Sequence, residues 1–159
     1  MIFFYKFISF LKIRYLNYLR KKILKIYKSN NLQLGFGIRI FNSNNVLIGD
    51  NVIIGDNVLL NADRGGKIMI GSNCAISEGV KIICWLHDLS KVNLKNSEPI
   101  FKNVEIGENV WIGYNSIILP GSKIGNNCRI GAGSVVSGEF ESGKIIFGNP
   151  GRVMGNINK

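Results

Sequence analysis

Large aliphatic residues recur every six positions through the second half of the chain. Between residues 104 and 136 this series is Ile106, Ile112, Ile118, Ile124, Ile130 and Val136. A second series, small or β-branched, lies two positions earlier, at Val110, Ser116, Ser122, Cys128 and Ser134. An amphipathic helix repeats at about 3.6 residues and a half-buried strand at about 2. The period of six therefore predicts a parallel β-helix, in which each hexad forms one flat face with its aliphatic residue inside.

Glycine and asparagine mark the expected corners of this β-helix. Glycine follows the aliphatic residue at positions 107, 113, 125 and 131, and asparagine occupies positions 109, 115 and 127. These two residue types adopt a positive backbone φ more readily than most others. We therefore expect positive φ values at the corners, supplied by both residue types.

The same register extends toward the N-terminus, with two interruptions. It runs through Ile48, Ile54 and Leu60, and after the insertion ADRGGK, a predicted surface loop, it resumes at Ile70, Ile76 and Ile82. Residues 88 to about 99 are polar, and Asp88 stands where an aliphatic residue is due. We expect a second loop there, and long loops in compact repeat domains are commonly functional. This loop begins directly after His87, the single histidine of the chain.

Residues 1–30 follow a helical period instead of hexads. Their apolar residues are three and four apart, and most of the basic residues gather on the opposite side. Basic residues interrupt every apolar run before it reaches the roughly 18 residues of a membrane span, and no signal-peptide cleavage site follows. We expect a basic amphipathic helix. It either lies on an anionic membrane surface through residues 1–28 or closes the open end of a β-helix that spans residues 31–155, before a short tail at 156–159.

The positive charge belongs almost entirely to the N-terminal segment. Residues 1–49 contain nine Lys or Arg and no Asp or Glu, whereas residues 50–159 contain eleven basic and ten acidic residues. The net charge of +10 therefore gives no reason to expect a nucleic-acid partner. The three cysteines form no CxxC motif. We interpret Cys74 and Cys128 as buried residues of a reducing cytoplasm, and the role of Cys84 stays open.

The motifs NVWIG, ILPG, IGAGSVV and GNPGRV lie between residues 104 and 154. Together they resemble the hexapeptide-repeat acyltransferases, most closely the maltose, galactoside and capsule or exopolysaccharide sugar O-acetyltransferases. The resemblance implies an all-β, left-handed parallel β-helix, an exception to the usual right-handed crossover. It also implies a cytoplasmic homotrimer that binds acetyl-CoA between subunits, uses no metal, and acetylates a sugar hydroxyl in surface polysaccharide biosynthesis.

His87 matches the position of the catalytic histidine of this family, immediately before the extruded loop. A neutral imidazole can take the proton of the acceptor hydroxyl at cytosolic pH. Asp88 either orients this imidazole or points away from it. Asn61 and Asp63 lie in the preceding coil, where relatives contact sugar hydroxyls, and they are either substrate-binding residues or ordinary corner residues.

The resemblance assigns acetyl-CoA to a second group of residues near the C-terminus. The group consists of Trp111, Gly113, Tyr114, Gly131, Ala132, Ser134, Pro150 and Arg152. The Tyr114 amide would face the thioester, the amides from Gly131 to Ser134 would hold the pantetheine arm, and Arg152 would face phosphate. Trp111 would line the cleft or pack between subunits. The sequence departs from the family at Gly138, where a lysine is common, and we expect Lys123 or Lys144 to replace it.

Other functions are compatible with parts of the sequence. The same fold would also serve an N-acetyltransferase of an amino sugar nucleotide or a structural solenoid without activity. A γ-class carbonic anhydrase is excluded because its zinc site needs three histidines and the chain has one.

Overall fold

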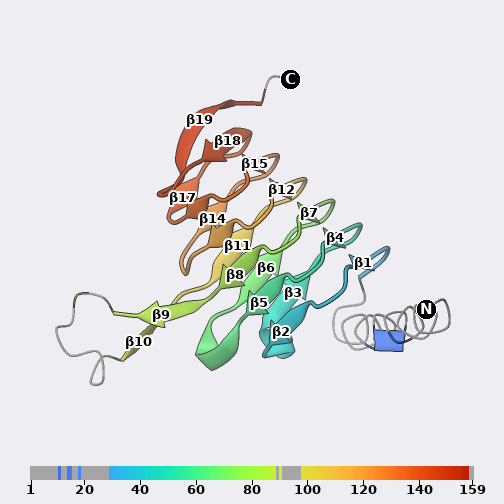
Figure 1. Ribbon diagram of the computed structural model, residues 1–159. Coiled ribbons are helices and arrows are strands. Elements are labelled where there is room, and N and C mark those ends of the chain that lie inside the picture. The colour runs from blue at the N-terminus through green and yellow to red at the C-terminus, as the bar shows by residue number, and fades with distance from the viewer. Residues whose placement is uncertain are drawn as a thin grey trace, which may run out of the picture.

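Three parallel β-sheets form the sides of a prism around which the chain winds (Figure 1). The computed structural model describes residues 11, 14, 15, 18, 29–88, 90 and 98–157, without the side chain of Arg64. Sheet A contains β1 (Gln33–Leu34), β4 (Ile53–Ile54), β7 (Ala75–Ile76), β12 (Trp111–Ile112), β15 (Arg129–Ile130), β18 (Lys144–Phe147) and β19 (Arg152–Asn156). Sheet B contains β2 (Arg39–Phe41), β5 (Leu59–Asn61), β8 (Lys81–Ile83), β13 (Ile117–Ile118) and β16 (Val135–Val136). Sheet C contains β3 (Val46–Ile48), β6 (Ile68–Ile70), β11 (Val104–Ile106), β14 (Lys123–Ile124) and β17 (Glu139–Phe140).

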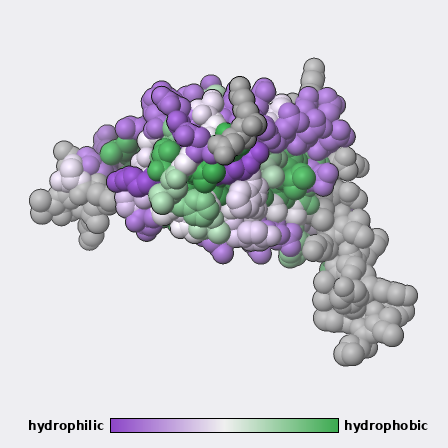
Figure 2. Space-filling model, turned by 90° about the horizontal axis from the view of Figure 1, so that it is seen from above, coloured by the Kyte–Doolittle hydropathy of each residue, from purple (hydrophilic) through white to green (hydrophobic). Residues whose placement is uncertain are grey.

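The aliphatic residues of the hexads fill the shaft of the prism, as predicted. Parallel pairing sets Ile112 directly between Ile76 and Ile130, and all three are buried. The predicted series of small residues is buried too, and the Ser116 hydroxyl donates to the Gly131 carbonyl at 2.9 Å, as a buried polar group must. The surface is a mosaic, and Figure 2 shows apolar patches separated by hydrophilic residues.

The corners confirm the prediction for asparagine and overturn it for glycine. Asn109, Asn115 and Asn127 have φ values of 53°, 56° and 59°. None of the four glycines that follow the aliphatic residues has a positive φ. They are needed for space: a Cβ on Gly107 would lie 2.8 Å from the Asn126 nitrogen, which is tighter than real contacts allow.

Every long excursion leaves the prism at the corner between sheets B and C. The short 3-10 helices η1 (Ser43–Asn45) and η2 (Asp63–Gly65) lie there, η2 within the predicted first loop. In the next coil, β9 (Trp85–His87) pairs antiparallel with β10 (Pro99–Phe101), and together they form an arm that projects from the prism (Figure 1). Pro99 thus belongs to a strand and not to the predicted loop, of which residues 89 and 91–97 lie outside the described part.

The two ends of the prism differ. The predicted N-terminal helix lies mostly outside the described residues, but residues 11, 14, 15 and 18 are helical. Tyr15 donates its hydroxyl to the Ile38 carbonyl at 3.1 Å. At the other end β19 turns back antiparallel on β18, so the predicted tail begins inside a strand. In the part of the chain that the structure describes, no helix has the length and apolarity to cross a membrane.

Candidate active site

His87 is the last residue of β9, on the arm, and its side chain is exposed. Side chains two apart on a strand point the same way, so His87 and Trp85 share one face of the arm. Their rings meet edge to face, with centroids 5.9 Å apart and an interplanar angle of 78°. The arm therefore presents an accessible imidazole that is held beside an indole.

Asp88 shapes the turn that follows β9. Its Oδ1 accepts hydrogen bonds from the Ser90 amide at 3.0 Å and from the Ser90 hydroxyl at 2.7 Å, a local side-chain turn typical of aspartate. The proposed alternative, that Asp88 orients the imidazole of His87, stays a prediction.

Asn61 and Asp63 lie beside the root of the arm, as expected from the coil order. The Asn61 carbonyl accepts from the Cys84 amide at 3.0 Å, and its Oδ1 accepts from the Asp63 amide at 3.1 Å. Asp63 is exposed and begins η2. One coil thus places two polar side chains next to the strand that carries His87.

Cys84, directly before the arm, is a packing residue. Its thiol is buried and donates to the Lys67 carbonyl at 3.1 Å. Burial raises the pKa of this thiol to about 11. Because the thiolate is the reactive form, a thiol that keeps its proton at neutral pH is not a nucleophile.

Most of the residues that the resemblance assigns to acetyl-CoA lie near the corner between sheets A and B, in successive coils, whereas Trp111 and Arg152 belong to strands of sheet A. Three of them have structural roles there. The amides of Gly113 and Gly131 each donate at 2.8 Å to a carbonyl of the next coil, and the buried Ser134 hydroxyl donates to the Gly131 carbonyl at 2.7 Å. The exposed members are Trp111, Tyr114, Ala132, Pro150 and Arg152.

Tyr114 has a partner that the sequence analysis missed. Its ring is 52% exposed, and a hydrogen bond to the Glu78 carboxylate raises the pKa of the Tyr114 phenol. Glu78 precedes Tyr114 by 36 positions, a multiple of six, so both hold the same place in their hexads. That spacing was the available signal.

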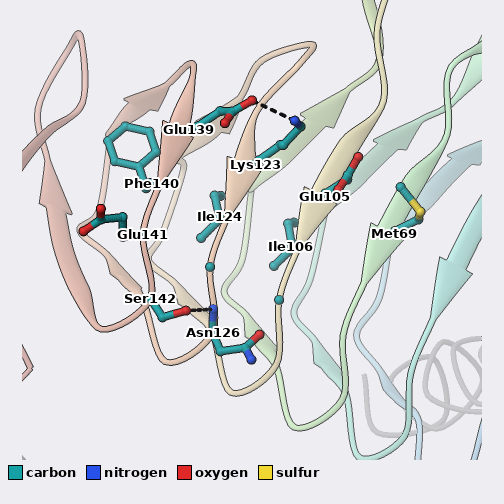
Figure 3. A pocket seen from close by; sticks show the side chains of 12 residues that line it. Met69, Glu105, Ile106, Lys123, Ile124, Asn126, Glu139, Phe140, Glu141 and Ser142 are labelled. Atoms are coloured by element: carbon teal, nitrogen blue, oxygen red, sulfur yellow. Dashed lines mark hydrogen bonds and ion pairs between the residues drawn. The ribbon is translucent and has the colours of Figure 1, made fainter.

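Neither lysine expected to replace the family's CoA-binding lysine is free. Lys123 lies on the outer face of sheet C, where its Nζ pairs with Glu139 at 2.7 Å (Figure 3), and this pairing raises the Lys123 pKa. A shallow groove of about 560 Å³ runs along this face. Lys144 pairs with Glu141 at 3.3 Å. Both cations are therefore balanced within the chain.

The two groups of candidate residues lie at different corners of the prism. His87, Asp88, Asn61 and Asp63 belong to the corner between sheets B and C, and the exposed CoA candidates to the corner between sheets A and B. One hexad, at most about 20 Å of extended chain, separates the corners. A single copy of the chain therefore places the two groups at neighbouring corners of the prism. The described residues contain no cluster of three or more His, Cys, Asp or Glu that could hold a metal ion.

Comparison with known proteins identifies the repeat. The family described as "Bacterial transferase hexapeptide (six repeats)" matches residues 103–138. A lipopolysaccharide biosynthesis O-acetyl transferase of Escherichia coli, provisionally named WbbJ, is 30% identical over 80% of this chain and 70% of its own length. The chain belongs to the hexapeptide-repeat acetyltransferase family. A galactoside acetyltransferase solved in complex with coenzyme A superposes with a TM-score of 0.73 at 29% identity, covering 86% of this chain and 68% of that one.

The structural similarity to these hexapeptide-repeat acetyltransferases confirms the predicted fold class, a left-handed parallel β-helix. The galactoside O-acetyltransferase of Lactococcus lactis is 37% identical over 57% of this chain and 44% of its own length. The chain thus spans less than half the length of that curated relative.

Proposed function

We propose that this chain is an acetyl-CoA-dependent O-acetyltransferase that modifies a sugar hydroxyl in surface polysaccharide biosynthesis. The observation that carries the proposal is the pair of corners: an exposed histidine on an arm at one, and at the other an exposed strip at the places where the family motifs lie. The WbbJ relative, named for lipopolysaccharide biosynthesis, supports a glycan acceptor. The galactoside acetyltransferase solved with coenzyme A supports the donor.

The chemistry needs one proton acceptor. A nitrogen of the His87 imidazole takes the proton from the sugar hydroxyl, and the oxygen of that hydroxyl attacks the thioester carbonyl carbon. The new C–O bond forms as the C–S bond breaks, and the proton then passes from the imidazole to the CoA sulfur. The products are an acetyl ester and CoA with a free thiol. The backbone amide of Tyr114 would donate to the oxygen that carries the developing charge.

The corner between sheets A and B suits an extended donor such as CoA. Ala132 offers a small exposed side chain at the hexad place that Tyr114 holds in the preceding coil. Arg152 is exposed, and its guanidinium donates to the Gly151 carbonyl at 3.2 Å. An arginine held in this way retains other N–H groups for a phosphate. We place the enzyme in the cytoplasm, where acetyl-CoA is made.

The active unit in this proposal is a homotrimer. A head-to-tail arrangement around a threefold axis closes on itself and repeats one contact three times. It would set the arm of one copy against the donor corner of the next, which joins the two groups that one copy holds at different corners. Each trimer would then contain three equivalent sites.

The first experiment measures CoA release with acetyl-CoA and a panel of sugars, sugar nucleotides and lipid-linked glycans. His87→Ala is expected to lower kcat by about a hundredfold or more, with CoA affinity unchanged in calorimetry. Glu139→Gln, an exposed change on sheet C, is the matched control. Equal turnover by His87→Ala would overturn the assignment, and turnover confined to amino sugars would replace O-acetylation by N-acetylation.

A complementation assay tests the shared site. Ala132→Trp fills the exposed donor corner and His87→Ala removes the base, so we expect each variant alone to have very low turnover. Randomly mixed trimers would contain about one quarter of sites built from an intact arm and an intact donor corner. Recovery of about a quarter of wild-type turnover on mixing supports the site between copies, and no recovery after verified subunit exchange contradicts it.

A further inference from the structure

Exposed apolar side chains gather at the N-terminal end of the prism. Thirteen large apolar side chains are exposed among the described residues. Seven of them lie between residues 11 and 53, although the described residues of that range are under a quarter of all those described. The seven are Leu11, Tyr15, Tyr18, Phe36, Phe41, Leu47 and Ile53.

Three of these side chains encircle the first coil. Phe36 lies at the corner after β1, Phe41 ends β2 and Leu47 is the middle of β3, and each is between 43% and 46% exposed. They lie at one corner and on two sides of the prism, so a second copy packed against one side would cover only part of the set. A surface that meets the prism end-on would contact all three.

The described part of the N-terminal helix adds to the same end. Leu11, Tyr15 and Tyr18 are four and three residues apart, a spacing that puts them on one helical face. Tyr15 fixes this face to the first coil through its hydrogen bond to Ile38 and through the ring of Phe36, whose centroid is 6.0 Å away. Leu11 and Tyr18 remain exposed beside this contact.

The charge of this end indicates the kind of surface. Residues 1–49 contain nine basic residues and no acidic one, and all ten acidic residues follow. Arg14 and Arg39, both described, are exposed. Basic residues near an anionic bilayer each contribute about 1 kcal/mol, and tyrosine rings favour the boundary between lipid and water.

We propose that the first coil, residues 33–48, and the helical residues 11, 14, 15 and 18 form a docking surface for an anionic lipid bilayer. The prism stands on the bilayer with its N-terminal end. The apolar side chains of Phe36, Phe41 and Leu47 enter the headgroup region. The exposed Arg14 and Arg39 pair with lipid phosphates. The inference goes beyond acetyl transfer and holds whether or not His87 is the base.

The test is sedimentation of the whole chain with vesicles of phosphatidylcholine alone or mixed with phosphatidylglycerol. We expect binding to the mixed vesicles, weakened by salt, and little to the neutral ones. Arg14→Gln and Arg39→Gln are each expected to lower the partition coefficient about fivefold. Phe41→Ser with Leu47→Ser should also weaken binding, because these side chains are exposed and their loss leaves the shaft intact.

The matched control lies at the opposite end of the prism. Val153 and Met154 are exposed to 48% and 70%, and their replacement by serine should leave vesicle binding unchanged. Lack of binding to the mixed vesicles, equal binding to both vesicle types, or an equal effect of the control overturns the proposal. If the Phe41 and Leu47 changes dissociate an oligomer without affecting lipid binding, these exposed side chains form a contact between copies of the chain. If DNA competes fully with the vesicles at equal phosphate, the surface is a polyanion site and not a bilayer site.

Discussion

Gly71 lies at one of the tightest contacts between coils, directly after β6. An alanine Cβ at this position would lie 2.6 Å from the carbonyl carbon and oxygen of Gly107 and 2.8 Å from the Glu108 nitrogen. Gly71 does not have a positive φ, so its backbone conformation would accept alanine. The obstacle is space alone, and the obstructing atoms are backbone atoms.

The expected cost of Gly71→Ala follows from these distances. Carbon atoms in contact prefer about 3.5–4.0 Å, so the two coils would have to separate by about 1 Å at this corner. The Gly71 amide donates to the Ile106 carbonyl at 2.8 Å, and this bond, worth about 1 kcal/mol, would be stretched beyond hydrogen-bonding distance. With overpacking strain of about 1–3 kcal/mol, we expect a loss of about 2–4 kcal/mol in the free energy of unfolding.

Urea unfolding followed by circular dichroism, at one protein concentration, measures this loss. Gly155→Ala is the control, because the nearest heavy atom to its Cβ would be Ile145 Cδ1 at 4.0 Å and its φ is not positive. We expect the control to change stability by less than about 0.5 kcal/mol. A Gly71→Ala variant as stable as wild type, or two variants destabilised equally, would refute the argument from coil spacing.

Two further predictions concern Cys84 and Asn109. Burial raises the Cys84 pKa from 9.0 to about 11, so the folded state holds a proton that the unfolded state releases, and stability should fall from about pH 9 to about pH 11; Cys84→Ala should show a shallower decline in urea titrations across this range. Asn109 has a φ of 53° and donates to the Asn127 side chain at 2.7 Å. Asn109→Ala should therefore cost about 1–2 kcal/mol more than Asn109→Gly, which accepts the same φ, and equal stability of the two variants would count against a strained corner.

The shaft could be predicted because its cause is local and repeats. Each hexad has one place for a large aliphatic side chain, so the spacing of Ile112 and Ile118 is enough to predict that both are buried. The function of Gly107 could not be predicted in the same way. Glycine serves both positive φ and close approach, and only the position of Asn126 in the next coil decides between them.

The members of the candidate site stay predictions, and their arrangement in space was not apparent from the sequence. The position of His87 before an irregular stretch was visible in the sequence. The pairing of β9 with β10 and the ion pair of Lys123 with Glu139 join residues from different strands. Lys123 and Glu139 are 16 positions apart, which is not a multiple of six, so the hexad period does not align them.

The stacking of strands fixes the positions of side chains along the axis of the prism in discrete steps. Neighbouring strands are about 4.8 Å apart, so axial offsets between side chains come in whole steps. The strand before Tyr114, β12, pairs with β7, and β7 belongs to the coil from which the arm departs. Tyr114 is thus one strand spacing from the root of the arm along the prism axis, and Ala132, which follows β15, is two strand spacings away. Removing the 18 residues 109–126, which form three hexads, would preserve the register of strand pairing. It would shift the donor corner toward the arm by one strand spacing. The axial distance between the arm and the donor corner is therefore set by the number of whole coils between them, and it cannot be adjusted gradually.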